Sequence, residues 1–123
     1  MNYAVTVSDS FEAKHYLTVP DSGPESELHP HTFGVEATFR GSELGAYGYL
    51  LDIDDAIAAL ETITDRYRHE KLNEYLEGNP SCERLAEAIY ADIRRAIDAE
   101  SVDRIEVRIH EDDTATVTYA GPA

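Results

Sequence analysis

Three histidines, His15, His29 and His31, are the residues whose type and spacing point most directly to chemistry. His29 and His31 are two residues apart, so on an extended strand both imidazoles face the same side of a sheet. An antiparallel neighbour would bring His15 alongside this pair. Three imidazole nitrogens with an open fourth position form the ligand set of a catalytic zinc site. We therefore expect a zinc centre, the alternative being three exposed strand histidines that pair with surface acids.

The composition limits the classes of function. With 123 residues the chain is long enough to bury a core, and we expect one domain over residues 1–123. Acidic residues outnumber basic ones by 25 to 10, which gives a formal net charge of −15. Such a surface repels phosphate backbones, so we expect no nucleic-acid partner. The acids are spread along the chain, which favours a protein kept soluble in concentrated salt over an ordinary acidic protein.

The sequence also predicts a cytoplasmic protein without a membrane partner. No stretch resembles a signal peptide, and no apolar run approaches the roughly 20 residues of a membrane span. The single cysteine, Cys82, cannot form a disulfide within the chain and suits a reducing compartment.

Hydrophobic periodicity predicts the strands that position the histidines. Alternating apolar residues predict strands over Tyr3–Leu17 and His29–Arg40, separated by a polar loop over Thr18–Leu28. Alternation over Ile105–Ile109 and Ala115–Tyr119 predicts a second pair of strands.

Between these pairs the period changes to three or four residues, which predicts two helices. The first is expected from Asp54 onward, and the second has Asn79 as its N-cap, Pro80 at its first position and its end near Ala99. The expected buried stripes are Ile53, Ile57, Leu60, Ile63 or Thr64, and Tyr67 in the first helix, and Leu85, Ile89, Ile93 and Ile97 in the second.

The element order is therefore ββααββ, an α+β fold in which two helices cover one face of a four-stranded antiparallel sheet. The other face of the sheet needs a second cover. Phe33, Val35 and Phe39, or their partners, could pack there against other subunits, which would also hide the sheet edges.

Six short motifs follow one another along nearly the whole chain. They are Phe11-Glu12-Ala13-Lys14-His15, Leu28-His29-Pro30-His31, Gly48-Tyr49-Leu50-Leu51-Asp52, His69 with Leu72-Asn73, Asn79-Pro80-Ser81-Cys82-Glu83, and Glu111 before Thr114-Ala115. In this order they resemble the 6-pyruvoyl-tetrahydropterin synthase and 6-carboxy-tetrahydropterin synthase family, with Pro30 in place of a family glycine.

The resemblance implies the tunnelling fold, in which subunits join their sheets into a barrel, commonly as a hexamer built from a dimer of trimers. It places active sites at subunit interfaces and implies a reduced pterin as the small-molecule substrate. Zinc would act as a Lewis acid on the vicinal hydroxyls of the pterin side chain.

The resemblance also implies roles for single residues. His69 would be a general acid/base, and its ordinary pKa near 6.5 suits that role. The family has an aspartate before this histidine, where this chain has Arg68, so another residue must orient the ring, and Asp65 is one possibility. The alternative is an exposed histidine near a helix end.

Three further residues would contact the pterin ring. Glu111 would accept two parallel hydrogen bonds from the ring N–H and the amino group. Ser81 and Glu83 would supply further contacts, although Glu83 could equally be a first-turn carboxylate that stabilises the helix dipole.

The main departure from the family lies four residues before the His-x-His pair, where the synthases carry a cysteine. That position is Glu25 here, with Glu27 two residues further on. A carboxylate keeps a general base but changes its strength and softness. Cys82 lies outside the motif, and we expect it to be a packing residue. The alternative is that both glutamates are ordinary loop acids.

Three functions remain open from the sequence. The first is a zinc-dependent lyase that cleaves the side chain of dihydroneopterin or its phosphates, with Glu25 in place of the family cysteine. The second is 6-carboxy-tetrahydropterin synthase, whose triphosphate substrate needs a basic patch for which Arg68, Arg66, Lys14 and Arg40 are the candidates. The third is a relative that binds zinc and pterin without turnover.

Overall fold

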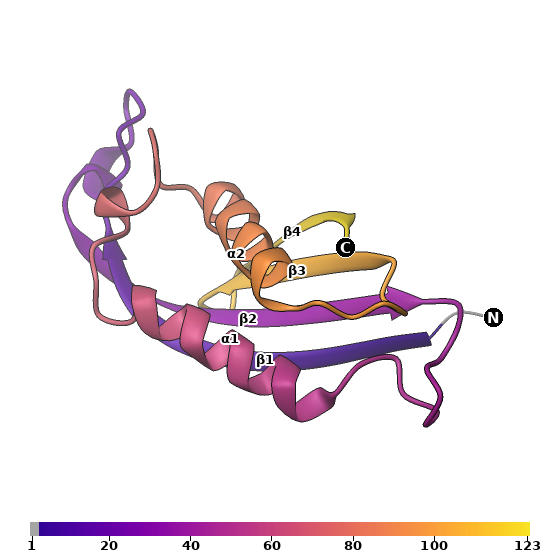
Figure 1. Ribbon diagram of the computed structural model, residues 1–123. Helices are drawn as coiled ribbons and strands as arrows, with labels where there is room; N and C mark the ends of the chain where they lie inside the picture. Colours follow the sequence, from indigo (N-terminus) through magenta and orange to yellow (C-terminus); the bar gives the residue numbers. More distant parts are fainter. Residues whose placement is uncertain (1–2) are drawn as a thin grey trace.

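The computed structural model describes residues 3–123 and confirms the predicted ββααββ order. Its elements are β1 (Tyr3–His15), η1 (Gly23–Ser26), β2 (His29–Gly41), α1 (Ile53–Tyr67), η2 (Leu72–Glu74), α2 (Cys82–Ala96), β3 (Arg104–Glu111) and β4 (Ala115–Pro122). The strands form one antiparallel sheet in the order β1-β2-β3-β4. Both helices lie along the same face of this sheet (Figure 1).

The odd-numbered residues of the strands lie on the face that the helices cover, and most of those in β1, β2 and β3 form the core. Phe33, Val35 and Phe39 are at most 1% exposed. The suggestion that they pack against other subunits is therefore wrong, because the helices already cover the apolar face. The open face carries polar and charged side chains instead: Thr6, Glu36, Thr38, Arg40, Glu106, Arg108 and His110.

Two details of the helices differ from the sequence prediction. Ile53 and Ile57 are 49% and 39% exposed, because Ala56 rather than these residues turns toward the sheet. The N-cap of α2 is Ser81, whose hydroxyl accepts a hydrogen bond from the Arg84 N–H at 3.1 Å. Asn79 caps nothing in α2, because its side-chain oxygen accepts a hydrogen bond from the Thr18 N–H at 2.8 Å.

Further hydrogen bonds, besides the one between Asn79 and Thr18, fix the loops at the end of the sheet where η1 and η2 lie (Figure 1). The Asn73 side chain makes two hydrogen bonds of 3.0 Å with the backbone of Tyr16. The Leu17 N–H donates to the Glu25 carbonyl at 2.7 Å. The loop between β1 and β2 is thus held against the segment between the helices, and this positions the side chains at the ends of both strands.

Neither α-helix within residues 3–123 has the length and apolar character needed to cross a membrane.

The two helices are joined by a polar cluster around Asp92, which is 7% exposed. Its carboxylate accepts a hydrogen bond from the Tyr67 hydroxyl at 3.0 Å and forms ion pairs with Arg66 at 3.1 Å and Arg95 at 2.5 Å. Burial, followed by the charge of Asp92, raises the pKa of Tyr67 to about 12. This cluster ties the last turn of α1 to the last turns of α2.

Replacing Asp92 with alanine is expected to lower the free energy of unfolding by about 1–3 kcal/mol, because the buried Tyr67 hydroxyl loses its partner. Urea titration followed by circular dichroism measures this change. Asp98→Ala is the control, since Asp98 is exposed and makes no side-chain hydrogen bond or ion pair with any residue in 3–123. Equal stability of the two variants would show that the cluster around Asp92 does not stabilise the fold.

Candidate metal centre and active site

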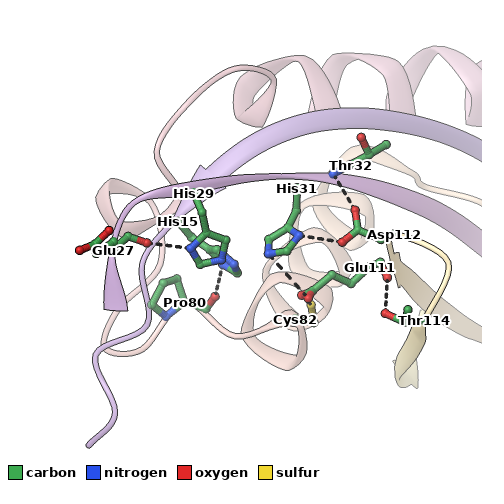
Figure 2. A network of polar contacts seen from close by, with 10 residues as sticks. All are labelled: His15, Glu27, His29, His31, Thr32, Pro80, Cys82, Glu111, Asp112 and Thr114. Carbon is green, nitrogen blue, oxygen red and sulfur yellow. Dashed lines mark hydrogen bonds and ion pairs between the residues drawn. The ribbon is translucent and has the colours of Figure 1, made fainter. Parts of the chain in front are cut away.

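The structure brings the three histidines together on the helix-covered face. His15 and His29 are direct partners across β1 and β2, and His31 follows two residues along β2. The ring centroids lie 4.6 to 5.1 Å apart, and one nitrogen from each ring lies within 4.8 Å of the other two (Figure 2). The convergence follows from the pairing of His15 with His29 across the two strands and from the two-residue spacing of His29 and His31, which puts all three rings on one face of the sheet.

Hydrogen bonds fix the tautomer of each imidazole. The Nδ1 atom of His15 lies 3.0 Å from the Pro80 carbonyl oxygen, and that of His29 lies 2.7 Å from the Glu27 carbonyl oxygen. The Nδ1 atom of His31 lies 2.8 Å from a carboxylate oxygen of Asp112. These oxygens can only accept, so each Nδ1 carries the proton. Each Nε2 is therefore left with a free lone pair.

Two of these lone pairs have no partner. The Nε2 atoms of His29 and His31 are buried and make no hydrogen bond with any residue in 3–123. A buried polar atom without a partner calls for a missing group, and a cation is the group that accepts imidazole lone pairs. Burial, as the largest cause, lowers the pKa of His15 and keeps it neutral at neutral pH, which metal binding requires. The donor set fits zinc.

A second group of candidate ligands overlaps the first. A carboxylate oxygen of Glu25, one of Glu111 and a nitrogen of His31 all lie within 4.8 Å of one another. Glu25 comes from η1, and Glu111 is the last residue of β3. The structure thus places the carboxylate of Glu25 beside His31. Glu27 faces the site only through its backbone carbonyl.

Cys82 is more than a packing residue. It is half-buried, and its thiol donates to Glu111 Oε2 at an Sγ–O distance of 2.6 Å. Burial, and then the neighbouring Glu111 carboxylate, raise the pKa of Cys82 above its usual range. The sulfur therefore stays protonated, as a hydrogen-bond donor rather than a nucleophile. No motif or periodic pattern indicates this contact, which joins residues that are 29 positions apart.

His69 lies apart from the three histidines of its own chain. It is exposed, and its N–H donates to the Glu12 carbonyl at 2.6 Å, at the outer edge of β1. Glu12 precedes His15 by three residues, about 10 Å along a strand. The backbone of His69 has a φ of 62°, which is uncommon outside glycine.

Asp65 does not orient His69. Its carboxylate accepts a hydrogen bond from Arg68 Nε at 3.1 Å, and Arg68 also donates to the Ser10 carbonyl at 3.0 Å. Arg68 therefore ties the end of α1 to β1, which explains why an arginine is useful at this position.

Of the other predicted substrate contacts, Ser81 caps α2, and Glu83 is exposed on the first turn of that helix. The candidate basic patch does not assemble within one chain. Arg66 pairs with Asp92 of α2, Arg68 with Asp9 of β1 and Arg40 with Glu106 on the open face, while Lys14 directly precedes His15 on β1. Arg40 is also nine residues along β2 from His31, or about 30 Å.

Asp112 is a candidate functional residue that sequence reasoning missed. It lies one position beyond β3, where its N–H donates to the Thr32 carbonyl at 3.0 Å and extends the pairing with β2. Its carboxylate is thereby held against the ring of His31. The hydrogen bond from His31 keeps the pKa of Asp112 below its usual range. Carboxylates in this position orient a ligating imidazole and raise its basicity.

Replacing Asp112 with asparagine is expected to weaken zinc binding by about 10–100-fold, because the amide keeps the shape of the side chain but loses its charge. Competition with a fluorescent zinc chelator measures the affinity. Asp113→Asn, one residue further on in the same turn, is the matched control and should bind zinc like the unaltered protein. Equal affinities of the two variants would exclude Asp112 from this role.

The geometry thus defines a small α+β protein with three converging histidines that could hold a metal ion at one end of its sheet. The model of the 6-pyruvoyl tetrahydropterin synthase family matches residues 4–122. A 6-pyruvoyl tetrahydrobiopterin synthase from Drosophila melanogaster is 31% identical over 134 residues, which cover 96% of this chain and 79% of the fly protein. The chain belongs to the 6-pyruvoyl tetrahydropterin synthase family, whose members are lyases.

Solved structures show the same fold. A 6-pyruvoyltetrahydropterin synthase from Plasmodium vivax superposes with a TM-score of 0.86 at 16% identity, covering 100% of this chain and 99% of that one. The Caenorhabditis elegans 6-pyruvoyl tetrahydropterin synthase gives a TM-score of 0.81 at 18% identity, covering 98% and 96%. The four strands and two helices thus have the same arrangement in proteins that share few residues with this chain.

Proposed function

We propose that this protein is a zinc-dependent lyase that cleaves the side chain of a reduced pterin, dihydroneopterin or one of its phosphates, with Glu25 as the base. The observation that carries the proposal is the position of the Glu25 carboxylate, within 4.8 Å of His31 and Glu111 donor atoms. A base is thus available beside the metal ligands, where the family has a cysteine.

One relative supports a carboxylate in this role. The Plasmodium vivax structure is that of a variant in which a glutamate, described as a catalytic residue, is replaced by alanine. A glutamate can therefore belong to the catalytic machinery of a protein with this fold.

The chemistry needs few groups. Zinc held by His15, His29 and His31 would supply Lewis-acid polarisation of the side-chain hydroxyls. Glu25 accepts the proton of the hydroxyl on the second side-chain carbon, and the bond between the first and second side-chain carbons breaks. The second carbon becomes the aldehyde carbon, and the electron pair of the broken bond moves into the ring imine. Protonation of the first carbon then gives 6-hydroxymethyl-dihydropterin, and the other fragment leaves as a two-carbon aldehyde. The Glu111 carboxylate anchors the pterin by accepting hydrogen bonds from the ring N–H and the amino group, and Ser81 and Glu83 add contacts at the edge of the ring.

The proton donor is assigned to His69 of a neighbouring subunit. Within one chain His69 lies at the outer edge of β1, away from the metal centre, so its role requires a second copy. Its left-handed backbone is the kind of local strain that persists at functional positions. β1 and β4 are the edges of the sheet, and joining such edges would build the expected hexamer and its barrel.

Two observations weigh on the alternatives. The dispersed arginines of this chain offer no triphosphate patch within one subunit, so 6-carboxy-tetrahydropterin synthase would need basic residues contributed by neighbouring subunits. The presence of a base beside the metal ligands favours an enzyme over a relative that only binds.

The test is to incubate the zinc-loaded protein with dihydroneopterin and, separately, with its triphosphate, and to identify products by mass. We expect 6-hydroxymethyl-dihydropterin and a two-carbon aldehyde or its phosphorylated form. Carboxy-tetrahydropterin as product would establish the second function. Tight binding without any product would establish the third.

A further inference from the structure

We propose that Glu111 is a fourth metal ligand in the pterin-free protein and that pterin binding removes it from the metal, so that substrate replaces a protein ligand. The first half rests on the metal centre alone. The second half rests on the proposed function, because it needs a pterin as the competing partner of Glu111.

The position of Glu111 suits a metal ligand. It is on the same face of the sheet as His31, since it pairs with Phe33 across β2 and β3. Its Oε1 lies 3.9 Å from His31 Nε2, the buried atom that has no partner among residues 3–123. Donor atoms on a tetrahedral zinc ion lie roughly 3.4 Å apart, given bonds of about 2.0–2.1 Å. The Glu111 carboxylate lies within 4.8 Å of donor atoms of His31 and Glu25 but is not grouped with His15 and His29, so its side chain must rotate toward these two histidines to complete the coordination.

Cys82 holds the carboxylate in this orientation. Its S–H donates to Oε2 at 2.6 Å, so the other oxygen, Oε1, is turned toward His31 (Figure 2). The side chain of Glu111 is 24% exposed, so it can also move without disturbing the core.

A position of Glu111 beside the metal ligands conflicts with its role as the anchor of the pterin ring. A carboxylate that anchors pterin binds the guanidine-like edge of the ring, whereas the side-chain hydroxyls near the metal lie at the opposite end. One carboxylate cannot be beside the metal and at the far edge of the ring at once. Glu111 must therefore change partner when pterin binds.

The exchange would give the site two states. Without substrate, three imidazoles and one carboxylate close the coordination sphere, as in structural zinc sites. With the ring bound, the released position becomes available to a side-chain hydroxyl. The metal would then be reactive only when a pterin is in place.

Cobalt substitution tests both the coordination of the metal by Glu111 and the release of Glu111 on pterin binding, without an activity measurement. The visible spectrum of Co²⁺-loaded protein reports the ligand set, and oxidised neopterin serves as the probe because it keeps the ring edge and the side-chain hydroxyls. We expect Glu111→Gln to change the pterin-free spectrum and to weaken zinc binding about tenfold or more. Glu87→Gln, an exposed glutamate on α2, is the control and should match the unaltered protein.

Neopterin is expected to shift the spectrum of the unaltered protein and of Glu87→Gln. If Glu111→Gln fails to fold, Glu111→Asp keeps the charge but shortens the reach, and it should show the same altered spectrum. Identical pterin-free spectra and zinc affinities in the unaltered protein and both Glu111 variants would overturn the proposal. A Glu111-dependent spectrum that neopterin leaves unchanged would overturn the exchange. Failure of the lyase assay would leave the pterin-free result intact, so the two proposals fail separately.

Discussion

Glu25→Ala is expected to lower turnover of dihydroneopterin by about 10²–10⁴-fold while zinc remains bound. The carboxylate lies within 4.8 Å of donor atoms of His31 and Glu111, so its loss removes the base from the site. The three imidazoles come from β1 and β2 and do not depend on η1, where Glu25 lies. Steady-state kinetics and elemental analysis on the same preparation measure both quantities.

Glu27→Ala provides the matched control. Glu27 lies two residues away in the same acidic loop, but it contacts His29 through its backbone carbonyl, which the substitution leaves in place. We expect nearly unaltered turnover. A large loss in Glu27→Ala together with normal rates in Glu25→Ala would reverse the assignment of the base.

His69→Ala is expected to reduce turnover by a similar factor of about 10²–10⁴, again with zinc retained, because it removes the proposed proton donor. If the donor comes from a neighbouring subunit, two inactive variants can restore each other. Mixing Glu25→Ala and His69→Ala subunits, after dissociation and reassembly, should recover a fraction of the activity, since some interfaces then contain both intact residues. His110→Ala is the control for the loss of a histidine, because His110 pairs with Glu36 on the open face of the sheet.

The mixing experiment separates two explanations of a loss. Activity that returns only in the mixture places Glu25 and His69 of different chains in one site. A mixture as inactive as its components, despite assembly seen by light scattering, would contradict a shared site.

The fold could be predicted because its signals are local. The alternation of Phe33, Val35 and Phe39 has the period of a strand, and the spacing of Leu85, Ile89 and Ile93 has that of a helix. Finer features depend on tertiary contacts. Ile53 and Ile57 fit the predicted stripe but are exposed, because Ala56 allows α1 to lie close to the sheet. Likewise Asn79 has the type of an N-cap, but its oxygen is engaged by Thr18.

In the site, too, some features have a local signal in the sequence and others depend on tertiary contacts. Strand parity was enough to expect three converging histidines, because residues two apart on a strand share a face. The partner of His31 could not be predicted, since Asp112 reaches it across 81 positions and lies in a turn with two adjacent aspartates. The contact between Cys82 and Glu111 depends on how α2 packs on β3. Contacts of this kind have no periodic signal in one sequence.

X-ray absorption spectroscopy of the zinc-loaded protein would show whether His15, His29 and His31 hold one divalent metal ion. We expect one zinc per chain, three nitrogen ligands at about 2.0–2.1 Å and the loss of this signal in His31→Ala. Protein that stays metal-free after reconstitution, or zinc that is retained unchanged in His31→Ala, would show that these histidines do not form a metal site.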